Sequence, residues 1–197
     1  NTETIAQILQ PAVHRELARP WAETLAAWIT ENAPGGFRWH VSGDVYSLEY
    51  ARWIAAVCRA APSVPFWIYT RSFGTQPLDW ILDELVRVST LKGGNLAVNL
   101  SCDVDNYEAA VDTALRLESQ GMAIRLCYLT TDGIVPALEE GDVIFPDYAL
   151  RPRQFATLAE SPWWQTLTSD QRGLVCPVDA HGKSAKRRCG PCARCLT

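Results

Sequence analysis

The sequence predicts an α/β fold, a parallel (βα) partial barrel of four to five strands with N-terminal helices and a C-terminal metal-binding cap. Two observations carry this prediction. Strand-like and helix-like segments alternate through the middle of the chain, and four of the seven cysteines lie between Cys176 and Cys195. With 197 residues, 48% hydrophobic and 20% charged, the chain suits one globular domain with a sizeable core.

Residues 1–36 are predicted to form helices packed on the core. One apolar face recurs over residues 2–18, with Pro11 as an interruption. A second helix is predicted to begin at Pro20, because apolar residues then repeat at spacings of three and four: Trp21, Leu25, Trp28 and Ile29. The Ala-Pro-Gly-Gly run at 33–36 ends it.

Residues 37–148 are predicted to form the partial-barrel core. Strands are expected over 37–42, 66–70, 95–100, 123–129 and 142–145. Helices are expected over 48–60, 78–90 and 107–119, with a short one over 135–140. Helices of this length between strands imply parallel pairing through right-handed crossovers.

Residues 149–197 are predicted to form the cysteine-rich cap. A loop with a short helix is expected over 150–167, where Trp163 and Trp164 form an aromatic anchor. The tail that follows is expected to fold back on the core, stabilised by the metal it binds.

The cysteine spacing predicts a metal centre. Cys176 is followed by a twelve-residue loop and then by a C-x2-C-x2-C run, which makes the predicted ligands Cys176, Cys189, Cys192 and Cys195. Three cysteines at successive two-residue spacings are typical of iron–sulfur proteins, so the predicted cofactor is a 4Fe–4S cluster. Four thiolates also suit tetrahedral zinc, and zinc remains the alternative. Two further alternatives are His181 in place of Cys176, and disulfides or free thiols without a metal.

The other three cysteines lie inside apolar segments. Cys58, Cys102 and Cys127 are therefore expected to be buried thiols. Cys102 and Cys127 are expected near the ends of two adjacent strands. The alternative for these two residues is therefore a role as extra metal ligands or as redox-active thiols.

Polar residues collect where the predicted strands end, which is where parallel α/β folds bind ligands. The candidate pocket residues are His40, Ser42, Asp44, Tyr69, Arg71, Asn99, Arg125 and Asp147. The first three alternate along the chain and would share a face if the strand continued that far. His40 is also a candidate proton donor or acceptor. The alternative is that each polar residue makes an internal hydrogen bond or ion pair.

Charge and missing motifs exclude several classes. A net charge of −4 gives no overall signature of nucleic-acid binding. Basic residues gather only in the tail, at Lys183, Lys186, Arg187, Arg188 and Arg194, where they either offset the charge of a cluster or contact phosphate. No phosphate-binding glycine loop, dinucleotide-binding turn or G-x-S-x-G elbow is present.

The hydropathy of the chain and its first residue indicate its cellular location and processing. No signal peptide or membrane-length apolar run appears, which predicts a cytoplasmic protein without membrane association. The chain begins at Asn1 rather than at a methionine, as expected of a fragment or a trimmed product.

Three motifs resemble those of a family of uncharacterised phage and mobile-element proteins catalogued after a mycobacteriophage gene product. They are H-x-S-G-D at 40–44, Y-T-R-S at 69–72, and a Cys-Pro start with a C-x2-C-x2-C finish at 176–195. The resemblance covers residues 37–197. It implies a partial barrel similar to the core of radical S-adenosylmethionine enzymes, with an iron–sulfur centre. The C-x3-C-x2-C loop of true radical enzymes is absent, and the family has no assigned reaction.

Together these observations predict an iron–sulfur protein of redox or electron-transfer function, with a ligand pocket at the strand ends. Its expected partner is a redox protein or a small-molecule ligand. One alternative is a zinc-stabilised module of a mobile element that binds nucleic acid or protein. The other is a degenerate relative of radical S-adenosylmethionine enzymes. Whether the protein is an enzyme stays open at this level.

Overall fold

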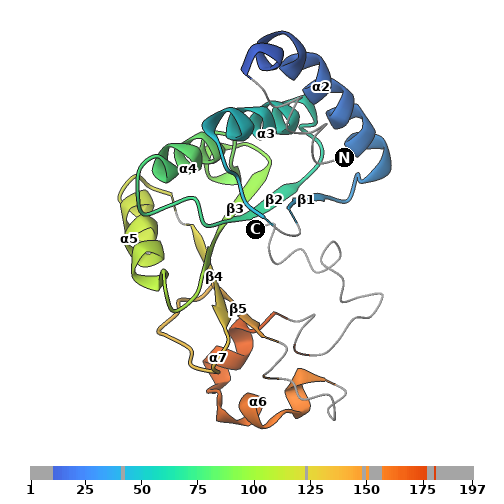
Figure 1. The fold of residues 1–197 in the computed structure, drawn as a ribbon. Coiled ribbons are helices and arrows are strands. Elements are labelled where there is room, and N and C mark those ends of the chain that lie inside the picture. Colours follow the sequence, from blue (N-terminus) through green and yellow to red (C-terminus); the bar gives the residue numbers. More distant parts are fainter. Residues whose placement is uncertain are drawn as a thin grey trace. The chain divides into compact units, whose positions relative to one another are not determined.

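A computed structural model describes residues 11–40, 43–122, 124–147, 150, 157–176 and 180 of the protein, without the side chains of 11–19 and 91. In this part of the chain five parallel strands form one sheet, in the order β1-β2-β3-β4-β5 (Figure 1). A strand order that follows the chain is typical of an opened (βα) barrel, whereas doubly wound sheets reverse direction. The predicted α/β partial-barrel class is therefore confirmed.

The strands coincide closely with the predicted ones. They are β1 Phe37–Trp39, β2 Phe66–Thr70, β3 Leu96–Cys102, β4 Arg125–Thr130 and β5 Val143–Pro146. In the register of the sheet, Asn99 lies opposite Arg125, and Cys127 lies opposite both Ser101 and Val143. The largest difference is in β1, which ends at Trp39, three residues before the predicted end of the strand at residue 42.

The helices are α2 Pro11–Asn32, α3 Leu48–Ala60, α4 Leu78–Val86, α5 Tyr107–Glu118, α6 Pro162–Thr166 and α7 Ser169–Leu174. Short 3-10 helices span Thr90–Lys92 and Leu158–Glu160. The predicted helices over 48–60 and 107–119 are confirmed, and the one over 78–90 ends earlier, at Val86.

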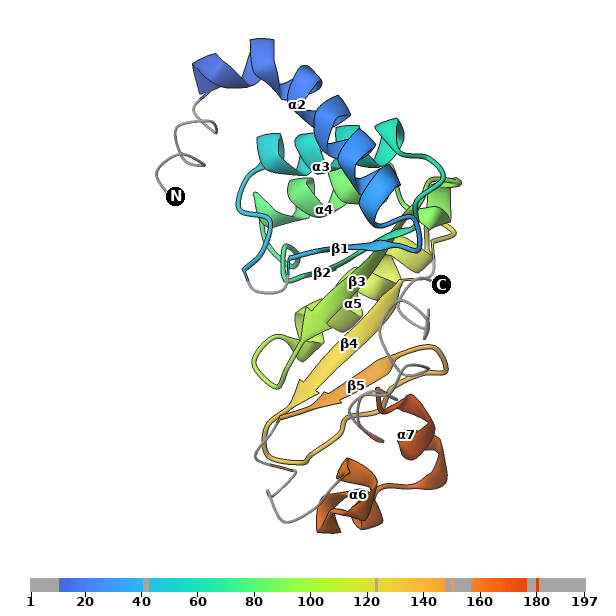
Figure 2. The ribbon, with the colours of Figure 1, turned by 90° about the vertical axis from the view of Figure 1, so that its right-hand side faces the viewer.

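The described chain divides into two compact units. The first comprises the residues up to Ile68 together with Thr75–Val98. Within it α3 packs against both α2 and α4, and all three helices lie on one side of β1 and β2 (Figure 2). Its interior is fully buried at Ile54, Leu82 and Leu85. Burial of such aliphatic side chains is the main source of stability in a layer of this kind.

Helix α2 differs from the prediction of two helices that meet at Pro20. It is one helix with Pro20 inside it, and its buried face consists of Ala22, Ala26 and Ile29. The two tryptophans assigned to the apolar face, Trp21 and Trp28, are 50% and 54% exposed. Small alanine side chains let α2 approach α3 closely. This packing outweighs the backbone hydrogen bond that proline cannot make.

The second unit comprises Tyr69–Gly74 and the described residues from Asn99 onward. Helix α5 packs on β4, and α7 packs on β5 (Figure 1). Residues of the segment after β5 form a hydrophobic cluster with that strand: Ile144, Leu158, Trp163, Leu167, Val175 and Ala180. The Trp163 indole Nε1 donates a hydrogen bond to the Gly133 carbonyl at 2.8 Å, which confirms this residue as an anchor.

The short helix predicted over 135–140 is wrong. Residues 134–139 have no regular secondary structure. The buried Asp142 carboxylate accepts hydrogen bonds from the backbone N–H groups of Leu126, at 2.8 Å, and Glu139, at 3.0 Å. This side chain therefore ties the segment to the start of β4 in place of the backbone bonds a helix would make.

Candidate functional site

Arg71 lies directly after β2 and forms an ion pair with Asp103, which follows β3. The Arg71 Nη2 and Asp103 Oδ2 atoms are 2.6 Å apart. The other carboxylate oxygen of Asp103 accepts a hydrogen bond from the Asp105 N–H at 3.1 Å. The predicted pocket residue Arg71 thus has its charge offset by a carboxylate that was not among the predicted pocket residues.

Asn99 in the middle of β3 and Arg125 at the amino end of β4 lie side by side in the sheet. They are directly opposite in the register of β3 and β4, and Asn99 is buried. Side chains point alternately to the two faces along a strand, so Cys102 of β3 and Tyr128 of β4, each three residues further on, belong to the other face. On that face the Tyr128 ring contacts Tyr107 of α5. The polar pair therefore lies on the sheet face opposite α5.

Tyr69 and Asp147 complete the predicted residues of the second unit. The Tyr69 ring contacts Phe145 edge-on, with centroids 5.6 Å apart. Asp147 follows β5, and its backbone N–H donates to the Thr130 carbonyl at 2.9 Å. Tyr69, Arg71, Asn99, Arg125 and Asp147 thus belong to one compact unit, whereas His40 and Asp44 belong to the other.

His40 follows β1 in an unusual backbone conformation. Its φ angle is +54°, so the strand does not continue through His40, and the condition under which residues 40, 42 and 44 would share a face is not met. Ser42 lies outside the described residues. The His40 ring meets Tyr50 edge-on at 5.4 Å, and its Nε2 atom is buried with no hydrogen-bond partner in the described chain. Burial lowers the pKa of His40, and the nearby Asp44 charge opposes that shift only in part. A neutral imidazole of this kind can accept a proton or bind a metal.

Cys176 is the one predicted metal ligand that the structure describes, since Cys189, Cys192 and Cys195 lie outside the described residues. Its N–H donates to the Ile144 carbonyl of β5, and its carbonyl accepts from the Ala180 N–H, both at 2.9 Å. The buried side chain packs with Cys127 and Val143, and Tyr69 and Phe145 lie against this group. Within the described ranges no three His, Cys, Asp or Glu side chains are grouped as a metal site.

The remaining cysteines are buried, as predicted. Cys58 and Cys102 are 0% exposed, and Cys127 is 2% exposed. Burial raises the pKa values of the Cys58 and Cys102 thiols to about 12, so both are protonated at neutral pH. A protonated thiol is a poor ligand and nucleophile. Of the two cysteines considered as extra ligands, only Cys127 packs beside Cys176.

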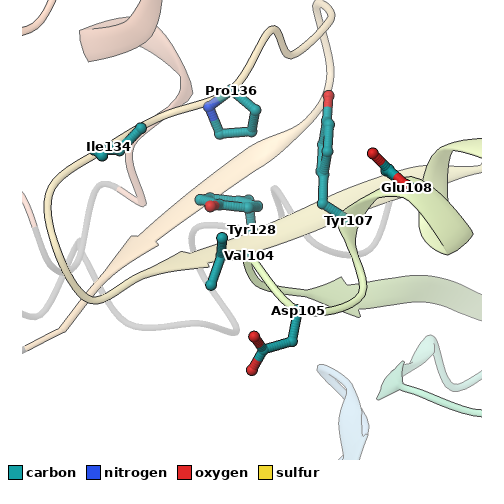
Figure 3. A pocket seen from close by; sticks show the side chains of 7 residues that line it. All are labelled: Val104, Asp105, Tyr107, Glu108, Tyr128, Ile134 and Pro136. Carbon is teal, nitrogen blue, oxygen red and sulfur yellow. The ribbon is translucent and has the colours of Figure 1, made fainter.

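A cavity of about 430 Å³ lies at the carboxyl ends of β3 and β4, on the α5 side (Figure 3). It is lined by Val104, Asp105, Tyr107, Glu108, Tyr128, Ile134 and Pro136. None of the predicted pocket residues lines it. Its place at the strand ends is nevertheless the one expected of a ligand site in a parallel α/β fold.

Comparison with known proteins identifies the family. The model of the family described as Gene product 88 matches residues 3–197, almost the whole chain. The chain belongs to the Gene product 88 family. The predicted resemblance to a phage protein family is thereby confirmed. No curated protein and no solved structure matches the chain.

In this Gene product 88 family member the sequence reasoning missed the cavity and the ion pair of Asp103 with Arg71. The sequence did contain one signal for the cavity, namely the position of its lining residues. The loop 103–106 follows a predicted strand, and Tyr107 begins a predicted helix. Tyr128 gave no such signal, since an aromatic residue inside a strand is usually assigned to the core. In the described part of the chain no helix is both long and apolar enough to cross a membrane.

Proposed function

We propose that the protein binds a 4Fe–4S cluster through Cys176, Cys189, Cys192 and Cys195 and functions in redox chemistry or electron transfer. The observation that carries the proposal is the cysteine spacing, together with the position of Cys176, whose backbone is hydrogen-bonded to Ile144 of β5. Soft thiolates in a C-x2-C-x2-C run suit iron–sulfur clusters, so the donor set fits this cofactor. A bound cluster would supply one-electron chemistry.

The surroundings of Cys176 support this role. Its backbone is held by hydrogen bonds on both sides, from its N–H to Ile144 and from Ala180 to its carbonyl. A ligand held in this way needs less ordering when the other three thiolates close around a metal. The Cys176 side chain is buried in a cluster with Cys127 and Val143, against which Tyr69 and Phe145 pack. Such burial protects thiolates and influences the reduction potential of a cluster.

A ligand site at the strand ends is the second part of the proposal. The candidates within the second unit are Tyr69, Arg71, Asn99, Arg125 and Asp147, with a small molecule or a redox protein as the partner. Support comes from the buried Asn99, a polar side chain in a strand interior that would ordinarily be apolar, with the half-buried Arg125 opposite it at the start of β4. Cysteine thiolates must stay reduced to hold a cluster, which favours the reducing cytoplasm as the location.

The test is anaerobic purification of the full chain followed by visible spectroscopy. We expect a brown protein, and loss of its colour when any one of the four cysteines, Cys176, Cys189, Cys192 or Cys195, is changed to serine. Cys58→Ala is the control, because this thiol lies on the buried face of α3 in the first unit and its loss should leave the colour unchanged. Colourless wild-type protein that contains one zinc ion would overturn the proposal.

A zinc-stabilised binding module is the second candidate, because four thiolates also suit tetrahedral zinc. The basic residues of the tail favour nucleic acid as its partner: Lys183, Lys186, Arg187 and Arg188. This function requires salt-dependent binding of DNA or RNA that is lost when these four residues are changed to alanine. Binding that survives the change would count against it.

A degenerate relative of radical S-adenosylmethionine enzymes is the third candidate. The strand order of an opened (βα) barrel favours it. Four cysteine ligands would leave no iron open to chelate the cofactor. Calorimetric titration of the anaerobic protein with S-adenosylmethionine tests this candidate. Heat of binding would support the relationship, and a titration without heat would exclude it.

A further inference from the structure

Two tyrosines form adjoining walls of the cavity at the ends of β3 and β4. The Tyr107 and Tyr128 ring centroids are 5.7 Å apart, and the ring planes meet at 89° (Figure 3). The Tyr107 hydroxyl donates a hydrogen bond to the Ala137 carbonyl, so its polar tip is already engaged. Tyr107 therefore offers a ligand mainly its aromatic ring, and Tyr128 adds a second ring; the faces of both carry a negative potential.

The loops around these rings are held in place by their own hydrogen bonds. In the loop after β3, the Asp103 N–H donates to the Asn106 side-chain oxygen at 2.8 Å. In the loop after β4, the Ile134 N–H donates to the Asp132 carboxylate at 2.9 Å, and the Gly133 N–H donates to the Thr130 hydroxyl at 3.0 Å. The walls are thus pre-formed, which lowers the entropic cost of binding.

The charged groups of the cavity are acidic. Of the seven described residues that line it, Asp105 and Glu108 carry carboxylates and none is basic. The N-terminus of α5 contributes a partial positive charge at Tyr107, which favours anions. Glu108 in the first turn of the helix and Asp105 just before it outweigh that partial charge. Val104, Ile134 and Pro136 supply apolar surface.

We propose that this cavity is a binding site for an organic ammonium ion on a short apolar body. The aromatic faces of Tyr107 and Tyr128 attract the cation, the carboxylates of Asp105 and Glu108 offset its charge, and the apolar side chains contact its carbon atoms. The ammonium group belongs either to a free small molecule or to a lysine side chain of another protein. The inference is independent of the metal centre proposed above.

The experiment is an NMR titration of the full chain, with isotope-labelled tyrosine, by ligands of one shape and different charge. The probes are choline, its neutral isostere 3,3-dimethylbutanol and the anion 3,3-dimethylbutyrate. We expect choline to shift the Tyr107 and Tyr128 resonances and to bind about five-fold or more tightly than either other probe. N-acetyl-lysine amide identifies the source, since tighter binding than choline points to a protein side chain and weaker binding to a small molecule. Equal binding of all three shape-matched probes, preference for the anion, or no choline-induced shift would overturn the proposal.

Variants separate a binding role from a structural one. The double change Asp105→Asn with Glu108→Gln should weaken choline about five-fold, because it removes both carboxylates without a change of shape. Glu118→Gln is the matched control, an exposed residue at the other end of α5 with the same chemical change. Tyr107→Phe keeps the ring and should retain binding, whereas Tyr107→Leu should lose it. Similar loss in the Glu118 variant, or undiminished binding in the double variant, would contradict the site.

Discussion

His40 is half-buried, with its Nε2 atom shielded from water, and this position makes the stability of the fold depend on pH. Burial lowers its pKa in the folded protein below the ordinary value of 6.5 that the unfolded chain retains. As the pH falls through that value, the unfolded chain therefore takes up a proton before the folded protein does. The free energy of unfolding should decrease as the pH falls below about 6.5 and should be unaffected by His40 above it.

The change His40→Asn tests this linkage. Asparagine tolerates the positive φ of this position better than most residues and does not titrate. We expect urea unfolding at pH 7.5 and 5.5 to show a smaller loss of stability in the variant than in the wild type. Identical losses in the two proteins would mean that His40 contributes nothing to the pH dependence.

Asn95 connects three backbone segments of the first unit. Its side-chain amide donates to the carbonyls of Cys58, Ala61 and Val64, at 3.1, 2.8 and 2.9 Å. The change Asn95→Ala removes this donor from three carbonyls in α3 and in the turn after it. It should therefore lower the free energy of unfolding by about 1–3 kcal/mol. Asn32→Ala, which removes one exposed amide-to-backbone hydrogen bond, should cost less than about 0.5 kcal/mol. Equal losses on chemical denaturation would contradict the role of Asn95.

At the scale of secondary structure, a capping box fixes the start of α7. The Gln171 N–H donates to the Thr168 hydroxyl at 3.2 Å, and the Thr168 N–H donates to the Gln171 side-chain oxygen at 3.0 Å. Thr168→Ala should cost about 1 kcal/mol of stability. Thr30→Ala is the control, because the Thr30 hydroxyl bonds back to a carbonyl within α2 and contributes little. Thermal unfolding compares the two, and a Thr30 variant less stable than the Thr168 variant would refute the assignment.

Most elements could be predicted from their periodicity, and the exceptions have physical reasons. The sequence pattern placed β2 correctly because its buried run is bounded by prolines and a polar loop. It failed at α2, where Ala22 and Ala26 form the contact face and larger apolar residues are exposed. It also failed over 135–140, where the Asp142 side chain replaces backbone hydrogen bonds. In each failure a tertiary contact outweighs the local preference.

The candidate site was less accessible from the sequence. The position of Arg71 after β2 follows from the strand prediction, but its ion pair with Asp103 depends on how the two loops meet. The cavity is likewise formed by loops after β3 and β4, about thirty residues apart in the chain, which parallel pairing brings together. The conformation of His40 was not predicted, because its backbone turns where an extended strand was expected.

At the scale of the whole molecule, metal binding should couple to the folding of the second unit. Cys176 is tied to β5 by its N–H bond to Ile144, and α7 precedes it directly. If Cys176 is a ligand, part of the metal-binding free energy stabilises this region. Removal of the metal by chelation should accelerate hydrogen exchange at the Cys176 amide and in α7, while α3 in the first unit keeps its protection. Unchanged exchange at Cys176 would argue against its role as a ligand.

Quantitative analysis of metal and inorganic sulfide in the anaerobically purified full chain tests the proposed cluster most directly. For a 4Fe–4S cluster held by Cys176, Cys189, Cys192 and Cys195, we expect about four iron atoms and about four sulfide ions per chain. The Cys192→Ser variant should have markedly less of both. About one zinc ion per chain with no inorganic sulfide would contradict the cluster and establish a structural zinc site instead.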